Sequence, residues 1–227
     1  MTELREISIE KDYTTMSLSS VLYSSGETKV LVTTSISDFL PRWLVGENYG
    51  WVTAEYSMLP GSSPQRVNRS SYEKGRSKEI SRLIGRSLRT VVDLEKIEGL
   101  SITVDCDVLQ ADGGTRTAAI NGAWIALKDT FQKLVENRII KEDPILGQIA
   151  AVSVGILDGE IFLDLDYSQD SNADVDLNVV MNSEGEFIEI QGTGEKKSFS
   201  KQQLDNMIDT ATKGISQILD IQMKEFS

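Results

Sequence analysis

Apolar residues alternate with polar ones along four segments of the first half of the chain. The segments are residues 4–10, 19–25, 28–36 and 50–59, and they are rich in β-branched side chains. A period of two with this composition is typical of strands. Apolar residues then recur every three or four positions from Ile80 to Val91, with Arg82, Arg86 and Arg89 on the other side. This spacing predicts an amphipathic helix.

The second half repeats this order of elements. Residues 101–109 predict a strand, and an apolar stripe predicts a helix from Thr117 to about Asn137. Two strand pairs follow, 149–159 with 161–167 and 174–182 with 187–194, each joined across a Gly-containing turn. Ser200 and Gln203 resemble a capping box that starts a last helix, which reaches about Lys224. We therefore expect an α+β fold of duplicated β-α halves with mixed sheets, in one domain over residues 1–227.

The composition excludes several classes of function. No run of about 18 apolar residues is present, and the first residues lack an apolar signal core, which favours a soluble cytoplasmic protein. The single cysteine, Cys106, cannot form an intramolecular disulfide, and its strand-like surroundings predict a buried thiol. The chain has no histidine, so Ser-His and Cys-His catalysis and the commonest zinc ligand are excluded.

The charge is unevenly distributed along an acidic chain whose net charge is −12. This net charge argues against unselective binding of nucleic acid over the whole surface. Residues 66–89 nevertheless hold eight basic and two acidic side chains, whereas residues 158–176 hold seven acids and no base. The basic stretch would suit a phosphate polymer and the acidic one a metal ion. The alternative is that both are solvated faces. The polar loop 60–75 before the first helix has no periodicity and is interpreted as mobile or ordered by a ligand.

The segment LQADGGTRTAAI, residues 109–120, carries a candidate anion site. Gly113 and Gly114 allow the backbone amides to approach a ligand, Thr115 adds a hydroxyl and Arg116 a cationic fork. The predicted helix start points unpaired amides in the same direction, which suits a phosphate or carboxylate. The alternative is a plain turn with a threonine cap and a surface arginine.

The acidic segment offers a second candidate site. Asp174 and Asp176 fall on one side of the predicted strand, and Asp170 and Asp176 flank a short turn. Close carboxylates without a basic partner either share a proton or bind a cation, and oxygen ligands suit Mg²⁺ or Mn²⁺. One aspartate would then serve as a general acid or both as metal ligands. The alternative is an Asp-rich turn with capping roles. Because the chain has no G-x-x-x-x-G-K-[ST] motif, it is not a standard P-loop NTPase.

Several motifs in order resemble ribonuclease PH, a family of bacterial phosphorolytic exoribonucleases. They are GWVTAEYSMLP, GRSKEISRLIGRSLR, DCDVLQADGGTRTAAINGA, AAVSVGI, LDLDYSQDSNADVDLNVVM and EIQGTGE. The resemblance implies a tRNA nucleotidyltransferase in which inorganic phosphate attacks the last phosphodiester of an RNA 3′ end and releases a nucleoside diphosphate, reversibly. It implies trimming of precursor tRNA beyond the CCA end, a divalent metal such as Mg²⁺, and a homohexameric ring built as a trimer of dimers. The resemblance implies neither DNA nor a membrane as a partner.

The resemblance also assigns residues. The family's phosphate site implies Gly114, Thr115 and Arg116, together with Arg76, which Ser77 follows where the family has threonine. Its catalytic and metal-binding aspartates match Asp170 and Asp176. Gln169 and Leu177 stand beside them in place of the family's glutamate and methionine.

Some positions depart from the family pattern. The chain largely lacks an Arg-rich lead-in, Gly61 and Val45 stand where the family tends to have basic residues, and the loop before Arg76 is shorter. These positions bear on the affinity for tRNA and on ring contacts more than on chemistry. Two alternatives stay open. One is a catalytically inert RNA-binding ring subunit of an exosome-like assembly, and the other is a hydrolytic nuclease, in which the Gly-Gly-Thr-Arg loop would have no role.

Overall fold

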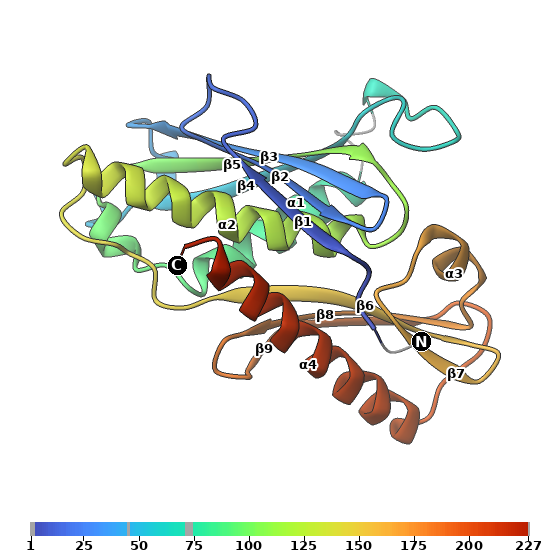
Figure 1. Ribbon diagram of the computed structural model, residues 1–227. Helices are drawn as coiled ribbons and strands as arrows, with labels where there is room; N and C mark the ends of the chain where they lie inside the picture. Colours follow the sequence, from blue (N-terminus) through green and yellow to red (C-terminus); the bar gives the residue numbers. More distant parts are fainter. Residues whose placement is uncertain (1–2, 45, 71–74, 227) are drawn as a thin grey trace.

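A computed structural model describes residues 3–44, 46–70 and 75–226 of the chain. It contains two β-sheets with helices between and beside them (Figure 1). The expected α+β fold with strands and helices repeated in two halves is confirmed. The boundary between the halves differs from the expectation, because the strand at 101–110 joins the first sheet, so this strand and the helix after it belong to the first half. Among the described helices, none is long and apolar enough to cross a membrane.

The first sheet has five strands in the order β1-β2-β3-β5-β4, and all neighbours are antiparallel except β4 and β5. The alternating pattern of the sequence explains this sheet, because the apolar side chains of each strand point to one face, where they pack against the helices. The strands are β1 (Ile7–Lys11), β2 (Ser19–Ser25), β3 (Thr28–Ser37), β4 (Trp51–Met58) and β5 (Ser101–Gln110).

The second sheet is antiparallel, in the order β7-β6-β8-β9. Both strand pairs predicted across glycine turns are confirmed, because β6 pairs with β7 and β8 with β9. The strands are β6 (Ile149–Leu157), β7 (Glu160–Leu163), β8 (Val175–Asn182) and β9 (Phe187–Gly194).

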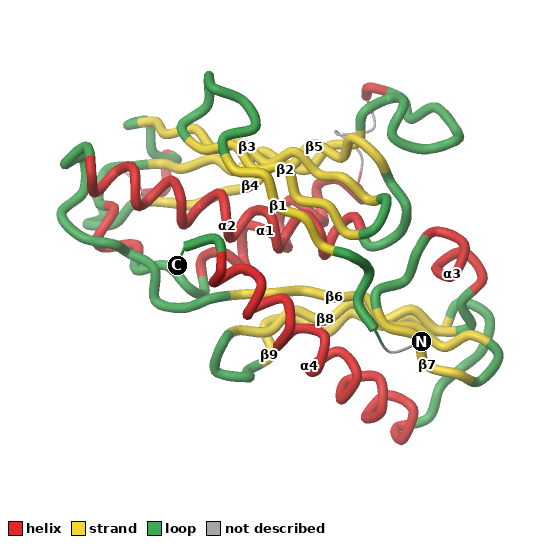
Figure 2. The backbone as a smooth tube through the Cα atoms, in the orientation of Figure 1, coloured by secondary structure: helices red, strands yellow, loops and turns green. Residues whose placement is uncertain are grey.

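Three long helices complete the layers. They are α1 (Gly75–Arg89), α2 (Thr115–Glu136) and α4 (Lys201–Lys224). Helix α2 contacts β2 and β3 of the first sheet and β6 of the second, so it lies between the sheets, whereas α1 covers β4 and α4 covers β6 and β8 (Figure 2). Short 3-10 helices span Arg42–Leu44 and Leu94–Ile97, and α3 (Tyr167–Asn172) adds one further short helix.

The buried residues explain this arrangement. The predicted stripe of α2 is fully buried at Ile120, Trp124, Leu127 and Phe131, since this helix has a sheet on each side. Met207 and other residues of the α4 stripe form a second cluster with β6, β7 and β8. Ser200 and Gln203 form the predicted capping box, which satisfies two amides at the start of α4. Cys106 is buried, as expected.

Three local expectations were wrong. Helix α2 begins at Thr115, two residues earlier than predicted, because Gly114 takes the N-cap position. Strand β7 ends at Leu163, since Asp164 adopts a left-handed conformation with φ of 53° that interrupts the strand. Asp174 lies before β8 and binds Lys197 Nζ at 2.8 Å, so it does not share a strand face with Asp176.

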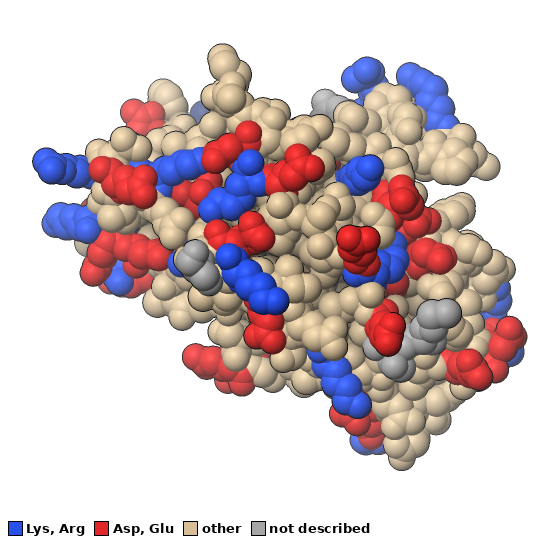
Figure 3. Space-filling view, viewed as in Figure 1, with Lys and Arg blue, Asp and Glu red and all other residues tan. Residues whose placement is uncertain are grey.

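The charged stretches have different surroundings. On α1, Arg82 and Arg86 are exposed, but Arg89 is not simply solvated, because its guanidinium lies 4.2 Å from the Trp51 ring centroid. Arg86 pairs with Glu189 of β9. Basic and acidic side chains alternate over the face shown in Figure 3.

Three positions of the sequence argument, Val45, Glu73 and Lys74, lie outside the described residues.

Candidate active-site cleft

A cleft of about 650 Å³ opens where the two sheets meet. It is lined from the first half by the end of β4, the loop after β5 and the starts of α1 and α2. The second half contributes α3, β8 and β9. All six residues proposed from the sequence line this one cleft, namely Arg76, Gly114, Thr115, Arg116, Asp170 and Asp176. The roles assigned to them remain predictions, but the tertiary structure brings all of them together.

The loop between β5 and α2 is shaped by its two glycines. Gly113 and Gly114 have φ of 73° and 62°, a left-handed conformation that favours glycine. A Cβ on Gly113 would lie 2.3 Å from the Leu165 carbonyl oxygen, so the loop passes directly against the segment that leads to α3. The N-cap residue Gly114 has no side-chain cap, and the first amides of the 22-residue helix α2 therefore lack that partner. The alternative of a plain turn with a threonine cap does not match this geometry.

Thr115 is held from behind by Tyr56. The two hydroxyl oxygens lie 2.8 Å apart, and burial raises the pKa of Tyr56 although this hydrogen bond and nearby arginines lower it. Tyr56 therefore stays neutral and acts as a hydrogen-bonding partner. The contact fixes the Thr115 hydroxyl at the start of α2, beside the uncapped amides.

Arg116 projects from α2 toward β9. Its Nη1 donates a hydrogen bond to Gln191 Oε1 and lies 3.4 Å from Glu79 Oε1 of α1. Gln191 in turn donates to the same Glu79 oxygen at 3.3 Å. Arg76 lines the same cleft at the start of α1. Burial raises the pKa of Asp170 and both arginines oppose this shift, so the cationic groups and the carboxylates share one electrostatic environment.

The two aspartates come from different elements of the second half. Asp170 lies on α3, which starts with a capping box between Asp166 and Gln169 and is not a simple turn. Asp176 lies on β8, and its Oδ2 accepts a hydrogen bond of 3.1 Å from Asn178 Nδ2.

Both aspartates are harder to ionise than usual. Burial, and then the negative charge of Asp170, raise the pKa of Asp176 to about 6, while Arg116 and Asn178 oppose the shift. Burial also raises the pKa of Asp170, and Glu195 contributes in the same direction. The pair thus holds a proton readily near neutral pH or attracts a cation.

The donor set fits a divalent ion that shares its ligands with substrate. Within the described residues, no three Asp, Glu, His or Cys side chains cluster closely enough to hold a metal by themselves. Mg²⁺ commonly keeps several waters and binds one or two carboxylates plus substrate phosphates. Asp170 and Asp176 provide such a pair, and burial with the negative charge of Asp170 raises the pKa of Asp176 even though Arg116 opposes the shift.

Sequence reasoning missed several residues that line the cleft. Tyr167 begins α3 and is 56% exposed, and Gln191, Thr193 and Glu195 extend along and just beyond β9. The spacing of two between these last three was a usable signal, because alternate residues of a strand share a face. Nothing in the local sequence marked Tyr167 as a neighbour of the Gly-Gly-Thr-Arg loop.

A comparison against family models identifies the family of the chain. A model described as "3' exoribonuclease family, domain 1" matches residues 3–131, and one described as "3' exoribonuclease family, domain 2" matches residues 147–214. The chain belongs to the 3′ exoribonuclease family. The resemblance seen in the motifs is therefore confirmed at the level of the family.

Solved structures with this fold include exosome proteins. The archaeal exosome of Archaeoglobus fulgidus with RNA bound to the active site matches with a TM-score of 0.82 and 20% identity, over 100% of this chain and 90% of that one. Rice (Oryza sativa) Rrp46 matches with a TM-score of 0.78 and 19% identity, over 100% and 97% of the two chains. An archaeal exosome core gives 0.79 and 20%, over 98% and 88%. At these identities the similarity shows the fold of the family.

Proposed function

We propose that the chain is a phosphate-dependent 3′-to-5′ exoribonuclease. The observation that carries the proposal is the meeting, in one cleft, of an uncapped glycine loop and two arginines with a pair of carboxylates of raised pKa. The first set suits an attacking phosphate, and the second suits the breaking phosphodiester. Chemistry of this kind depends mainly on positioning and on the stabilisation of charge.

Each group has a role in this reaction. Inorganic phosphate lies against the Gly114 loop, the Thr115 hydroxyl and the guanidinium groups of Arg76 and Arg116. One phosphate oxygen attacks the last phosphorus of the RNA, and the bond from that phosphorus to the preceding ribose 3′ oxygen breaks. This oxygen takes a proton. One aspartate of the pair is a source when it is protonated, and water is the source when both carboxylates are ionised around a metal ion. The product is a nucleoside diphosphate.

A divalent ion such as Mg²⁺, with Mn²⁺ as a substitute, would be held by Asp170 and Asp176. When bound, it supplies positive charge against the phosphate oxygens. The protein's own groups are already in position, because Gln191 fixes Arg116 and Tyr56 fixes Thr115 before any substrate arrives. Groups fixed in advance do not have to reorganise during the reaction.

The substrate in this proposal is the 3′ end of RNA, such as precursor tRNA beyond its CCA end. The exposed ring of Tyr167 lies in the cleft beside Asp170 on the same helix. A ring in this position gives a stacking surface to a base and is indifferent to sequence. The ring-shaped homohexamer implied by the family is part of the same proposal. The exosome cores with this fold support a multimeric assembly, and the number and identity of the subunits are left to experiment.

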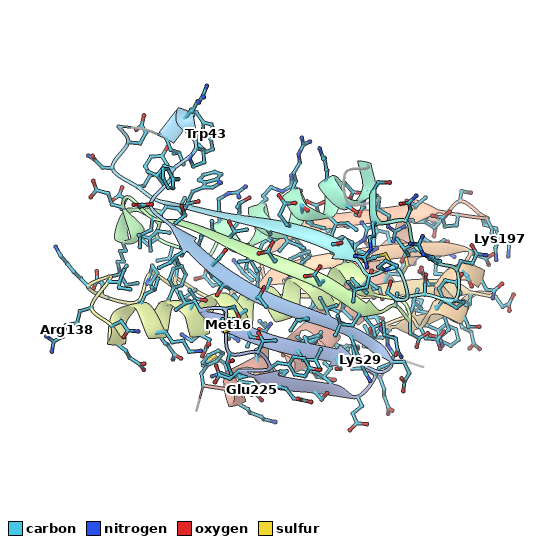
Figure 4. All side chains as sticks on the ribbon, turned by 90° about the horizontal axis from the view of Figure 1, so that it is seen from above. Met16, Lys29, Trp43, Arg138, Lys197 and Glu225 are labelled. Atoms are coloured by element: carbon cyan, nitrogen blue, oxygen red, sulfur yellow. The ribbon has the colours of Figure 1, made fainter. Side chains whose placement is uncertain are left out.

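The test is product analysis of a tRNA with a 3′ extension, incubated with Mg²⁺ and with or without phosphate. Nucleoside diphosphates formed only with phosphate support phosphorolysis. Monophosphates formed at every phosphate concentration would show a hydrolase and overturn the proposal. Arg116→Gln should abolish most diphosphate release. The matched control is Arg138→Gln. Lys197 forms an ion pair with Asp174 of the acidic segment, and Arg138 lies at the opposite end of the molecule from Lys197 (Figure 4).

A second candidate is a ring subunit that binds RNA without catalysis. The fold similarity to exosome proteins favours it as much as an enzyme. It predicts that wild-type protein binds the RNA, forms a ring by light scattering and releases no nucleotide. Two observations favour catalysis over this candidate. The complete set of six site residues lines one cleft, and the pKa values of both aspartates are raised.

A further inference from the structure

Arg5 binds a buried aspartate of the other half of the chain. It lies in the segment before β1 and its Nη2 donates to Asp164 Oδ1 at 2.7 Å, while its backbone amide donates to Asp164 Oδ2 at 3.1 Å. The Ser25 hydroxyl donates a third hydrogen bond, of 2.8 Å, to Oδ2. Asp164 is 6% exposed and follows the end of β7, where its positive φ turns the chain toward α3.

The same arginine holds the Gly-Gly-Thr-Arg loop. Its Nη1 donates to the carbonyl oxygen of Asp112 at 2.6 Å. The Asp112 carboxylate then accepts a hydrogen bond of 3.2 Å from the Tyr167 amide, at the first residue of α3. On the far side of the loop, the Thr28 hydroxyl donates to the Gly113 carbonyl oxygen at 2.6 Å. Arg5 thus connects the loop, which belongs to the first half, with the segment that leads to Asp170.

We propose that Arg5 and Asp164 are positioning residues that set the phosphate loop against the aspartate pair, an inference that rests on the proposed function. Neither residue lines the cleft within the described part of the chain. Their effect acts through geometry. The loop follows a strand of the first sheet and α3 follows a strand of the second. The hydrogen bonds of Arg5 and Asp112 join the two segments where their backbones meet. Displacement of a positioned group by about 1 Å lowers the rate of such a reaction on the order of 100-fold.

Arg5 also has an electrostatic role. A Cβ at Gly114 would lie 3.0 Å from Arg5 Nη2 and 3.6 Å from Asp164 Oδ1, so both charges stand directly behind the loop. A buried carboxylate at that position repels an anion bound in front of the loop. The guanidinium of Arg5 neutralises it through a short charge-assisted hydrogen bond. Removing Arg5 therefore both loosens the loop and exposes the phosphate to an unpaired negative charge.

The variants are Arg5→Gln, Arg5→Lys, Asp164→Asn and the double variant R5Q/D164N, with Arg138→Gln as the control. We expect Arg5→Gln to raise the KM for phosphate at least tenfold and to change the KM for RNA less than twofold. Arg5→Lys should fall between this variant and the wild type. The double variant should bind phosphate better than Arg5→Gln, because the unpaired carboxylate is gone. A residue that only stabilises the fold would not separate the two KM values in this way.

Phosphate binding is also measured without turnover, as the rise in thermal unfolding temperature at increasing phosphate and constant ionic strength, adjusted with NaCl. If wild-type protein releases no nucleoside diphosphate but loses its phosphate-dependent stabilisation on Arg5→Gln, the proposed function fails and the positioning role stands. Wild-type protein that phosphate does not stabilise would overturn the positioning role. An unchanged phosphate KM in folded Arg5→Gln would do the same. If Arg5→Gln does not fold, Arg5→Lys and Asp164→Asn provide the same comparison.

Discussion

Replacing Asp176 with asparagine should stabilise the folded protein in the absence of metal. The ordinary pKa of this carboxyl is 3.8, and burial together with Asp170 raises it to about 6. A raised pKa means that the folded state disfavours the ionised form. The stability that the neutral carboxyl allows is present below pH 4 and is lost as the pH rises through 6. Asparagine avoids this loss and keeps an oxygen that can accept the hydrogen bond from Asn178.

The magnitude follows from the size of the shift. About two pKa units at 1.36 kcal/mol each give a penalty of about 3 kcal/mol at pH 7.5 and less than about 1 kcal/mol at pH 4. The gain of Asp176→Asn over the wild type should therefore grow by about 2 kcal/mol between these two pH values. This difference is independent of any pH-insensitive effect of the new side chain.

The assay is urea unfolding of both proteins at pH 4 and pH 7.5, at one protein concentration and with a chelator present. Asp220→Asn, on the exposed surface of α4, controls for the loss of one negative charge. Added Mg²⁺ at pH 7.5 should narrow the gap, since a bound cation stabilises the wild-type carboxylate pair. The reasoning would be refuted if the gain in unfolding free energy of Asp176→Asn over the wild type were the same at both pH values. It would also be refuted if the variant were less stable than the wild type only at pH 7.5.

Three further predictions use separate parts of the structure. Tyr167→Ala should raise the KM for RNA about tenfold while Tyr167→Phe stays near wild type, because stacking needs only the ring; equal effects in steady-state kinetics would argue against stacking. Gly113→Ala should lower the free energy of unfolding in urea by more than about 1 kcal/mol, since the new methyl would lie 2.3 Å from the Leu165 carbonyl oxygen. Unchanged stability would contradict the observed loop conformation. Burial strongly raises the pKa of Cys106, so a thiol reagent should modify it only after unfolding. Rapid labelling of native protein would contradict this.

The sequence by itself determined most of the elements and part of the site. Period-two and period-three-to-four patterns identified the strands and the long helices, because burial of one face is a local property of each element. The glycine loop and the two aspartates were also visible, since their backbone and charge requirements are local. Asp170, however, was predicted to flank a short turn and lies on α3, because the hydrogen bonds between Asp166 and Gln169 favour a short helix there.

Only the tertiary structure decided which of these residues meet. Arg76, Arg116 and Asp176 lie 40 and 60 residues apart along the chain but line one cleft, because α2 is packed between the two sheets. The roles of Arg5, Asp164 and Tyr167 had no local signal, since each depends on a contact across the two halves, over 55 to 159 residues of sequence. The pKa of Asp176 likewise arises from burial and from neighbours that only folding supplies. Chemistry that depends on distances between remote segments is set by packing, which no local pattern records.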